Sequence, residues 1–222
     1  MTRAGAKPGL APPWAVVVAA VALLAGTVFA ALVWHTGQPD PFDAWVMRGQ
    51  EVAYAHSNGV ARVVSGTVAS VAIALMLTSS AVAWLVGRWD AVVLALAAIP
   101  TALGVEVLLK QLVHRQRPGG PDLVYPSGHL AVAAAAALTL ALVLRVTPAP
   151  PRTRVVVAVL AGGYVLIVAA ARLVETVHFL TDVLGGVTTG IVVTLAAALA
   201  ITAWSREREV RGSPLGPRRK DP

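Results

Sequence analysis

The 222-residue sequence contains no cysteine and few charged residues. The absence of cysteine excludes disulfides and thiolate metal sites, and it gives no information on whether the protein faces an oxidising or a reducing compartment. Charged residues make up 13% of the chain against 57% hydrophobic residues, and the mean hydropathy is +0.73. Because so few charges cannot cover the surface of an ordinary globular domain, the composition excludes a typical soluble protein.

The formal net charge of +7 raises the question of a nucleic-acid partner. Much of the basic excess lies in the tails and in short loops beside apolar runs, and no basic stripe interleaved with aromatic residues is present. Basic residues that flank apolar runs are typical of membrane proteins. We therefore expect a lipid bilayer as partner, no nucleic acid and no obligate protein partner.

Six apolar runs are candidates for crossing a bilayer. A hydrocarbon core of about 30 Å needs about 20 helical residues, and the fourth and fifth runs are near the lower limit. The predicted spans are residues 14–34, 63–87, 91–109, 127–144, 155–171 and 183–204. The sequence therefore predicts an all-α integral membrane protein, in which a bundle of six transmembrane helices forms one domain over residues 14–204.

Three further segments lie outside these spans. Residues 1–13 are predicted to be an N-terminal tail, and the charged, Pro- and Gly-rich residues 205–222 a disordered basic tail. Residues 41–56 carry apolar side chains at near-helical spacing, which fits an interfacial helix, with a plain outer loop as the alternative. A cleaved signal peptide at the N-terminus is disfavoured, because the apolar run is too long and cleavage would leave an odd number of spans.

The distribution of basic residues predicts the orientation. With both tails in the cytoplasm, 12 of the 18 Lys and Arg residues lie inside and six outside. The positive-inside rule therefore predicts cytoplasmic termini in the plasma membrane and an extracytoplasmic position for three polar clusters. The outer basic residues are Arg48, Arg62, Lys110, Arg115, Arg117 and Arg172.

The first polar cluster, Lys110-x6-Arg117-Pro118, follows the third predicted span. Lysine supplies a point charge and arginine a planar fork, so the pair can neutralise and orient phosphate oxygens. Arg115 adds a third charge, and His114 is a candidate for a fourth. The plain alternative is a basic loop whose side chains snorkel to the membrane edge.

The second cluster, Pro126-Ser127-Gly128-His129, begins the fourth predicted span. Ser127 is placed as a helix N-cap, and Gly128 lets a ligand approach the backbone. A helix N-terminus with free N–H groups favours an anion, and the imidazole of His129 can protonate a leaving oxygen. The alternative is a capped helix start with an incidental histidine.

The third cluster, Arg172-x5-His178-x3-Asp182, joins the fifth span to the sixth. His178 and Asp182 are four residues apart and share a helical face. A carboxylate that fixes one ring nitrogen leaves the other free to attack phosphorus, and Arg172 can stabilise the developing charge. A structural His–Asp pair that caps the sixth helix is the alternative.

Glu106 lies four residues before Lys110, where it either orients and neutralises that lysine or forms a bystander ion pair. A metal site is the alternative interpretation of the same polar residues. The spacing shows no His-x3-His or HExxH pattern, and three cations would compete with a metal, so we expect no metal. The rival ligand set is His114, His129, His178, Asp182 and Glu106.

Taken together, the clusters resemble the type 2 phosphatidic acid phosphatase superfamily, whose pattern is K-x6-RP, then PSGH, then SR-x5-H-x3-D. The resemblance covers about residues 60–204, and the departure is Ala171, where the family usually has serine. That departure puts one phosphate hydrogen bond in doubt. The matching residues are Lys110, Arg117, Pro118, Pro126, Ser127, Gly128, His129, Arg172, His178 and Asp182.

The resemblance implies a mechanism without metal or cofactor, at the extracytoplasmic ends of the third to sixth helices. His178 would be the nucleophile that forms a phosphohistidine, with Asp182 orienting it and His129 acting as general acid. Glu106 and Arg115 are candidates for support. The residues that would hold the phosphoryl group are Lys110, Arg117, Ser127, Gly128 and Arg172.

The resemblance also implies a membrane lipid phosphate as substrate, reached laterally. Undecaprenyl diphosphate, the cell-wall carrier, is the expected substrate and undecaprenyl phosphate the product. Phosphatidic acid and phosphatidylglycerol phosphate are the alternatives. A lipid-phosphate binding or flipping protein without turnover is an alternative of another class, although binding alone needs neither a nucleophile nor an acid.

Overall fold

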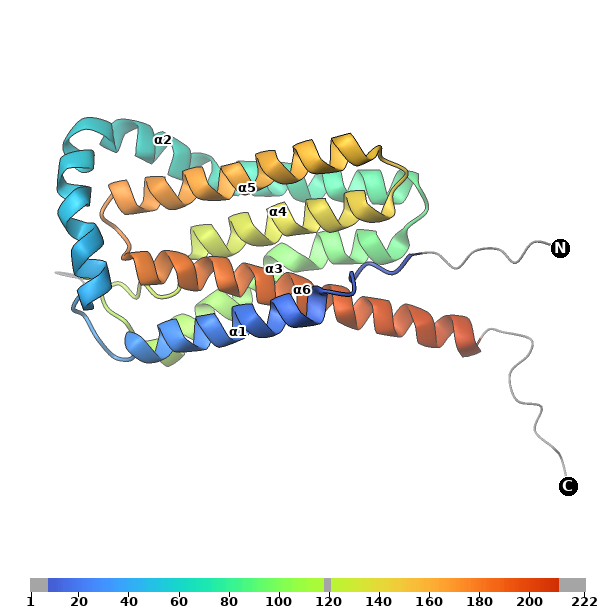
Figure 1. The fold of residues 1–222 in the computed structure, drawn as a ribbon, viewed down its shortest axis with the longest axis horizontal. Helices are drawn as coiled ribbons and strands as arrows, with labels where there is room; N and C mark the ends of the chain where they lie inside the picture. Colours follow the sequence, from blue (N-terminus) through green and yellow to red (C-terminus); the bar gives the residue numbers. More distant parts are fainter. Residues whose placement is uncertain (1–7, 118–120, 212–222) are drawn as a thin grey trace, which may run out of the picture.

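The computed structural model describes residues 8–117 and 121–211, which form six α-helices (Figure 1). Each contains a segment long and apolar enough to cross a membrane. The predicted all-α membrane fold with six spans is therefore confirmed. The helices are α1 Ala15–Leu32, α2 Pro41–Leu85, α3 Trp89–Val113, α4 Gly128–Val146, α5 Pro151–Val174 and α6 Leu180–Arg211.

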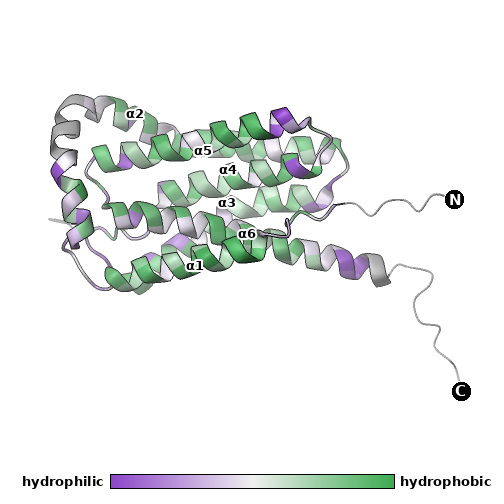
Figure 2. Ribbon diagram, in the orientation of Figure 1, coloured by the Kyte–Doolittle hydropathy of each residue, from purple (hydrophilic) through white to green (hydrophobic). Residues whose placement is uncertain are grey.

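The outer faces of the helices are apolar, and polar residues gather towards the helix ends (Figure 2). Leu24, Leu85 and Leu166 are among many large hydrophobic side chains that face outward. In water such a surface would aggregate, whereas in a bilayer it meets acyl chains while each helix satisfies its own backbone hydrogen bonds. The exposed surface therefore fits a protein that spans the membrane.

Helix α4 occupies the centre of the bundle, where it contacts α2, α3, α5 and α6. In its span 61% of the residues are buried, against 44% or less in each of the other five. Small residues allow the close approach to α6: a methyl group added to Gly190 would lie 2.8 Å from the Cβ of Ala134. A methyl group added to Gly186 would likewise lie 2.8 Å from the Cβ of Leu130, so the starts of α4 and α6, which carry His129 and Asp182, are closely packed as well.

Helix α2 begins well before its membrane span. Asp40 caps it by accepting hydrogen bonds from the N–H groups of Phe42 and Asp43, both at 2.8 Å, and Pro41 occupies the first turn. The part before Gly59 lies across one end of the bundle, and the rest runs along it (Figure 1). The helix predicted for residues 41–56 is therefore present, as a continuous extension of the second span, and the loop alternative is wrong.

The C-terminal helix extends further than predicted. Helix α6 continues to Arg211, so the prediction of disorder is wrong for residues 205–211. Arg and Glu favour helix, and the guanidinium of Arg208 stacks 3.7 Å from the ring centre of Trp204. Residues 1–7, 118–120 and 212–222, which include Pro118 and most of both predicted tails, lie outside the described residues.

Candidate active site

The three polar clusters converge at the end of the bundle over which the first part of α2 lies (Figure 1). Lys110 lies in the last turn of α3 and Arg172 in the last turn of α5. One cavity of about 470 Å³ opens at this end. The predicted site residues that line it are Lys110, Gly128, His129, Arg172 and His178, together with Glu106.

The opposite wall of this cavity is apolar. Val68, Ala72 and Ile73 of α2 line it, together with Ile99 and Leu103 of α3. All five belong to the membrane-spanning parts of their helices. The cavity therefore joins a charged end to a hydrocarbon-like wall, which suits a ligand with a polar head and an apolar chain.

Two of the three predicted phosphate-binding cations form ion pairs with neighbouring carboxylates. Lys110 Nζ lies 2.6 Å from Glu106 Oε1, and Arg172 Nη1 lies 2.6 Å from Glu175 Oε2. Ser65 donates to the same Glu175 oxygen at 2.9 Å. Within the described chain, Arg172 Nε is buried without a hydrogen-bond partner. Glu106 thus forms an ion pair with Lys110, which fits both sequence interpretations, and Arg172 retains donor capacity for an anion.

Arg117 lies beside a second cavity of about 190 Å³, which it lines with His178 and Phe179. Its Nη1 is 4.0 Å from a carboxylate oxygen of Asp122, and its side chain is 36% exposed. The arginine is therefore held more loosely than Lys110. Because His178 lines both cavities, the nucleophile candidate lies between Arg117 and the other cations.

His178 faces Asp182 through one ring nitrogen. The distance from Nδ1 to Oδ2 of Asp182 is 3.6 Å, longer than a hydrogen bond, and such catalytic contacts often shorten only when substrate binds. Burial lowers the pKa of the His178 imidazole below its ordinary value, and the charge of Arg172 adds to this effect while Asp182 opposes it. A lowered pKa keeps the ring neutral at neutral pH, so a nitrogen lone pair is available for attack.

Ser127 occupies the N-cap position of α4, but its side chain makes no capping hydrogen bond. Its hydroxyl is buried and has no partner among the described residues. Its backbone N–H donates instead to the carbonyl of Asp182 at 2.9 Å. The predicted capping interaction is therefore wrong: the Ser127 backbone ties α4 to α6, and the hydroxyl keeps its donor capacity.

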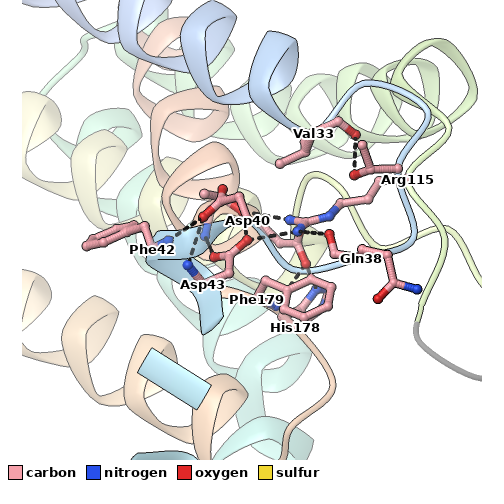
Figure 3. Close-up of polar contacts among 11 residues, drawn as sticks. Val33, Gln38, Asp40, Phe42, Asp43, Arg115, His178 and Phe179 are labelled. Atoms are coloured by element: carbon pink, nitrogen blue, oxygen red, sulfur yellow. Dashed lines mark hydrogen bonds and ion pairs between the residues drawn. The ribbon is translucent and has the colours of Figure 1, made fainter. Parts of the chain in front are cut away.

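Arg115 does not line either cavity. Its guanidinium is fully buried, where it donates from Nη1 to Asp182 at 2.7 Å and from Nη2 to Asp43 at 2.8 Å (Figure 3). The interpretation of Arg115 as an additional phosphate-binding charge is therefore wrong. Arg115 instead holds Asp182 in place from the side away from the cavity. Its two ion pairs with buried carboxylates keep the guanidinium out of the cavity.

Sequence reasoning missed Asp43 and Thr181 entirely. Asp43 accepts hydrogen bonds from the N–H of Thr181 at 2.9 Å and from its hydroxyl at 2.7 Å, besides its ion pair with Arg115. Asp43 is 138 residues from Thr181 in the sequence, so no local spacing predicts the contact. Glu175 was left unassigned, although its i,i+3 spacing from Arg172 was a usable signal.

His114 lies away from the cavities as well. It is exposed, adopts a left-handed backbone with φ 52°, and stacks on His35 with 5.6 Å between ring centres. It therefore adds no charge to the phosphate-binding residues. Over residues 8–117 and 121–211, no three His, Asp or Glu side chains are grouped so as to hold a metal ion.

A six-span bundle that joins cations and two histidines to an apolar wall defines an integral membrane enzyme that acts on phosphate compounds. The family model described as the PAP2 superfamily matches residues 91–206, more than half of the chain, and the chain belongs to this superfamily. It is therefore a lipid phosphate phosphatase, which favours an enzyme over the alternative of binding or flipping without turnover.

A solved structure supports the same fold. The crystal structure of a transmembrane PAP2-type phosphatidylglycerolphosphate phosphatase from Bacillus subtilis is similar, with a TM-score of 0.68 and 20% sequence identity. The match covers 85% of this chain and 96% of that chain. The comparison with curated proteins finds no match.

Proposed function

We propose that the chain hydrolyses undecaprenyl diphosphate to undecaprenyl phosphate, without a metal and through a phosphohistidine on His178. The observation that carries the proposal is the single cavity that joins His129, His178 and two cations to an apolar wall. A terminal phosphate fits the charged end, and the first part of a lipid chain fits the wall. Because that wall lies in membrane-spanning segments, the lipid would enter from the bilayer.

In the first half-reaction, the lone pair on Nε2 of His178 attacks the terminal phosphorus. A P–N bond forms, and the bond from phosphorus to the bridging oxygen breaks, with its electron pair leaving on that oxygen. His129 donates a proton to the leaving group, and Asp182 stabilises the positive imidazole. The cations that balance the charge on the phosphoryl oxygens are Lys110, Arg117 and Arg172.

In the second half-reaction, water attacks the phosphorus of the phosphohistidine. His129, now neutral, accepts a proton from that water, and the P–N bond breaks with its electron pair returning to His178. The products are the lipid monophosphate and inorganic phosphate, and His129 is again protonated. Each group therefore ends the cycle in its starting state.

A substrate panel tests the proposal. We expect purified protein in detergent to release phosphate from undecaprenyl diphosphate with a higher kcat/KM than from phosphatidic acid or phosphatidylglycerol phosphate. Activity should persist in EDTA, since Lys110, Arg117 and Arg172 supply the positive charge, and vanadate should inhibit by mimicking five-coordinate phosphorus.

Three other results would change the proposal. Faster hydrolysis of phosphatidylglycerol phosphate would favour the second candidate substrate, which the fold similarity to the Bacillus subtilis protein supports. Loss of activity in EDTA that returns with zinc or magnesium would contradict the metal-independent mechanism. No release from any lipid phosphate would reject the proposed reaction altogether.

The proposed orientation puts the site outside the cytoplasm, where the carrier diphosphate is left after cell-wall polymerisation. Asp122 is exposed beside the site, and Arg152 is exposed at the start of α5, at the other end of the bundle. We expect Asp122→Cys to react with a membrane-impermeant maleimide in intact cells, and Arg152→Cys to react only after lysis. The chain has no native cysteine, so the background is clean. The reverse labelling pattern would invert the orientation and remove an outer-leaflet substrate.

A further inference from the structure

Three buried charges lie behind His178, and the proposed mechanism uses only one of them. Arg115 donates to Asp43, as Figure 3 shows, and to Asp182, and all three side chains are fully shielded from solvent. The guanidinium also lies 4.1 Å from the ring centre of Phe179, the residue next to His178. In such a surrounding the effective dielectric is low, so that a single charge has a large effect on its neighbours.

The cluster carries one net negative charge, from one guanidinium and two carboxylates. With Arg115 and Asp182 alone, the ion pair would be neutral and little charge would act on His178. Asp43 compensates Arg115, and the charge of Asp182 then remains available. A positive imidazole forms when His178 attacks phosphorus, and a net negative charge beside it stabilises that state.

The other charges near His178 do not replace this one. Lys110 and Arg172 face the same imidazole, but each already has a carboxylate of its own, Glu106 and Glu175. Arg117, which lines the smaller cavity, adds a further positive charge. The buried cluster is therefore the source of negative charge on the Asp182 side of the ring.

We propose that Asp43 is a positioning residue that acts through Arg115, so that Asp182 keeps a full charge for His178; this rests on the proposed roles of His178 and Asp182. The same carboxylate accepts two hydrogen bonds from Thr181 in the first turn of α6. Asp43 therefore also fixes the turn that carries Asp182. Through Asp43 alone, the segment of α2 that lies across the bundle end thus acts on the proposed catalytic pair.

A double-mutant cycle on Asp43 and Arg115 tests this inference. The variants are Asp43→Asn, Arg115→Gln and the double variant, each assayed for kcat and KM with the lipid phosphate that the wild type hydrolyses best. Asp43→Asn keeps the shape of the side chain but removes its charge. We expect kcat to fall about tenfold or more and KM to stay within about twofold of the wild type. The reason is that a neighbouring charge shifts the pKa of an ionisable group by about one to three units. The double variant leaves Asp182 as the single charge, and its kcat should exceed that of Asp43→Asn.

Asp40→Asn is the matched control, since it removes one negative charge from the same helix start and asparagine caps a helix as well as aspartate. It should keep kcat within about twofold of the wild type. The inference is overturned if Asp43→Asn behaves like this control, if its loss lies in KM, or if the double variant is no better than Asp43→Asn. These failures differ from failure of the proposed function, in which the wild type itself releases no phosphate.

Folding is followed by size-exclusion chromatography and thermal unfolding of every variant. If Asp43→Asn does not yield folded protein, the double variant decides, because it removes the buried Arg115 charge together with the carboxylate that compensates it. A kcat of the double variant within about thirtyfold of the wild type then supports charge balance, and any larger loss overturns it.

Discussion

His178→Ala should abolish phosphate release while leaving the six-helix bundle folded. We expect kcat to fall by about four to six orders of magnitude, because loss of a covalent nucleophile leaves only binding and charge stabilisation. His178 lines both cavities and has Asp182 at 3.6 Å, whereas His129 lines the larger cavity. This geometry is the reason why we propose His178, and not His129, as the nucleophile.

Trapping of the intermediate provides an independent measurement. Wild-type protein mixed with substrate labelled in the terminal phosphate and quenched in alkali should retain label as phosphohistidine, and His178→Ala should retain none. His114→Asn is the control, since His114 is exposed and asparagine tolerates its left-handed backbone. Near-normal release by folded His178→Ala protein would rule out the assignment.

The membrane fold could be predicted from sequence because an apolar run is a local property. Every predicted span lies within or close to an observed helix, and the boundary errors have local causes. The prediction of a disordered tail from residue 205 rests on charge and on Pro and Gly content, although Arg and Glu favour helix and Arg208 stacks on Trp204. Composition identified the spans but not the continuation of α6 through Arg211.

The convergence of the three polar clusters was also predictable, since all three lie at span ends on one side. The buried cluster behind His178 was not. Asp43 contacts Arg115 across 72 residues and Thr181 across 138, and the contact depends on how α2 lies over the bundle end. No spacing within the sequence encodes that placement. The spacing therefore shows Arg115 as a further cation of the first cluster and a candidate for support, but not its two carboxylate partners.

Arg172→Ala should lower kcat/KM by about a hundred- to a thousandfold, as removal of one donor to a developing negative charge does in other enzymes. Glu175 holds Nη1 of this arginine, while Nε is buried without a partner in the described chain. The guanidinium is thus fixed in place and still able to donate to a phosphoryl oxygen. Ala171 offers no hydroxyl where the family usually has serine, so we expect Arg172 to contribute a larger share of the phosphate contacts here.

Arg172→Lys separates charge from geometry. Lysine keeps the positive charge but lacks the planar fork, so it should recover only part of the loss. Arg62→Ala is the control, because it removes one positive charge from an exposed site on α2 that does not line the cavity. Equal losses in Arg172→Ala and Arg62→Ala would indicate a long-range electrostatic effect. A loss confined to Arg172→Ala, with partial recovery in Arg172→Lys, would indicate direct contact between this guanidinium and the phosphoryl group.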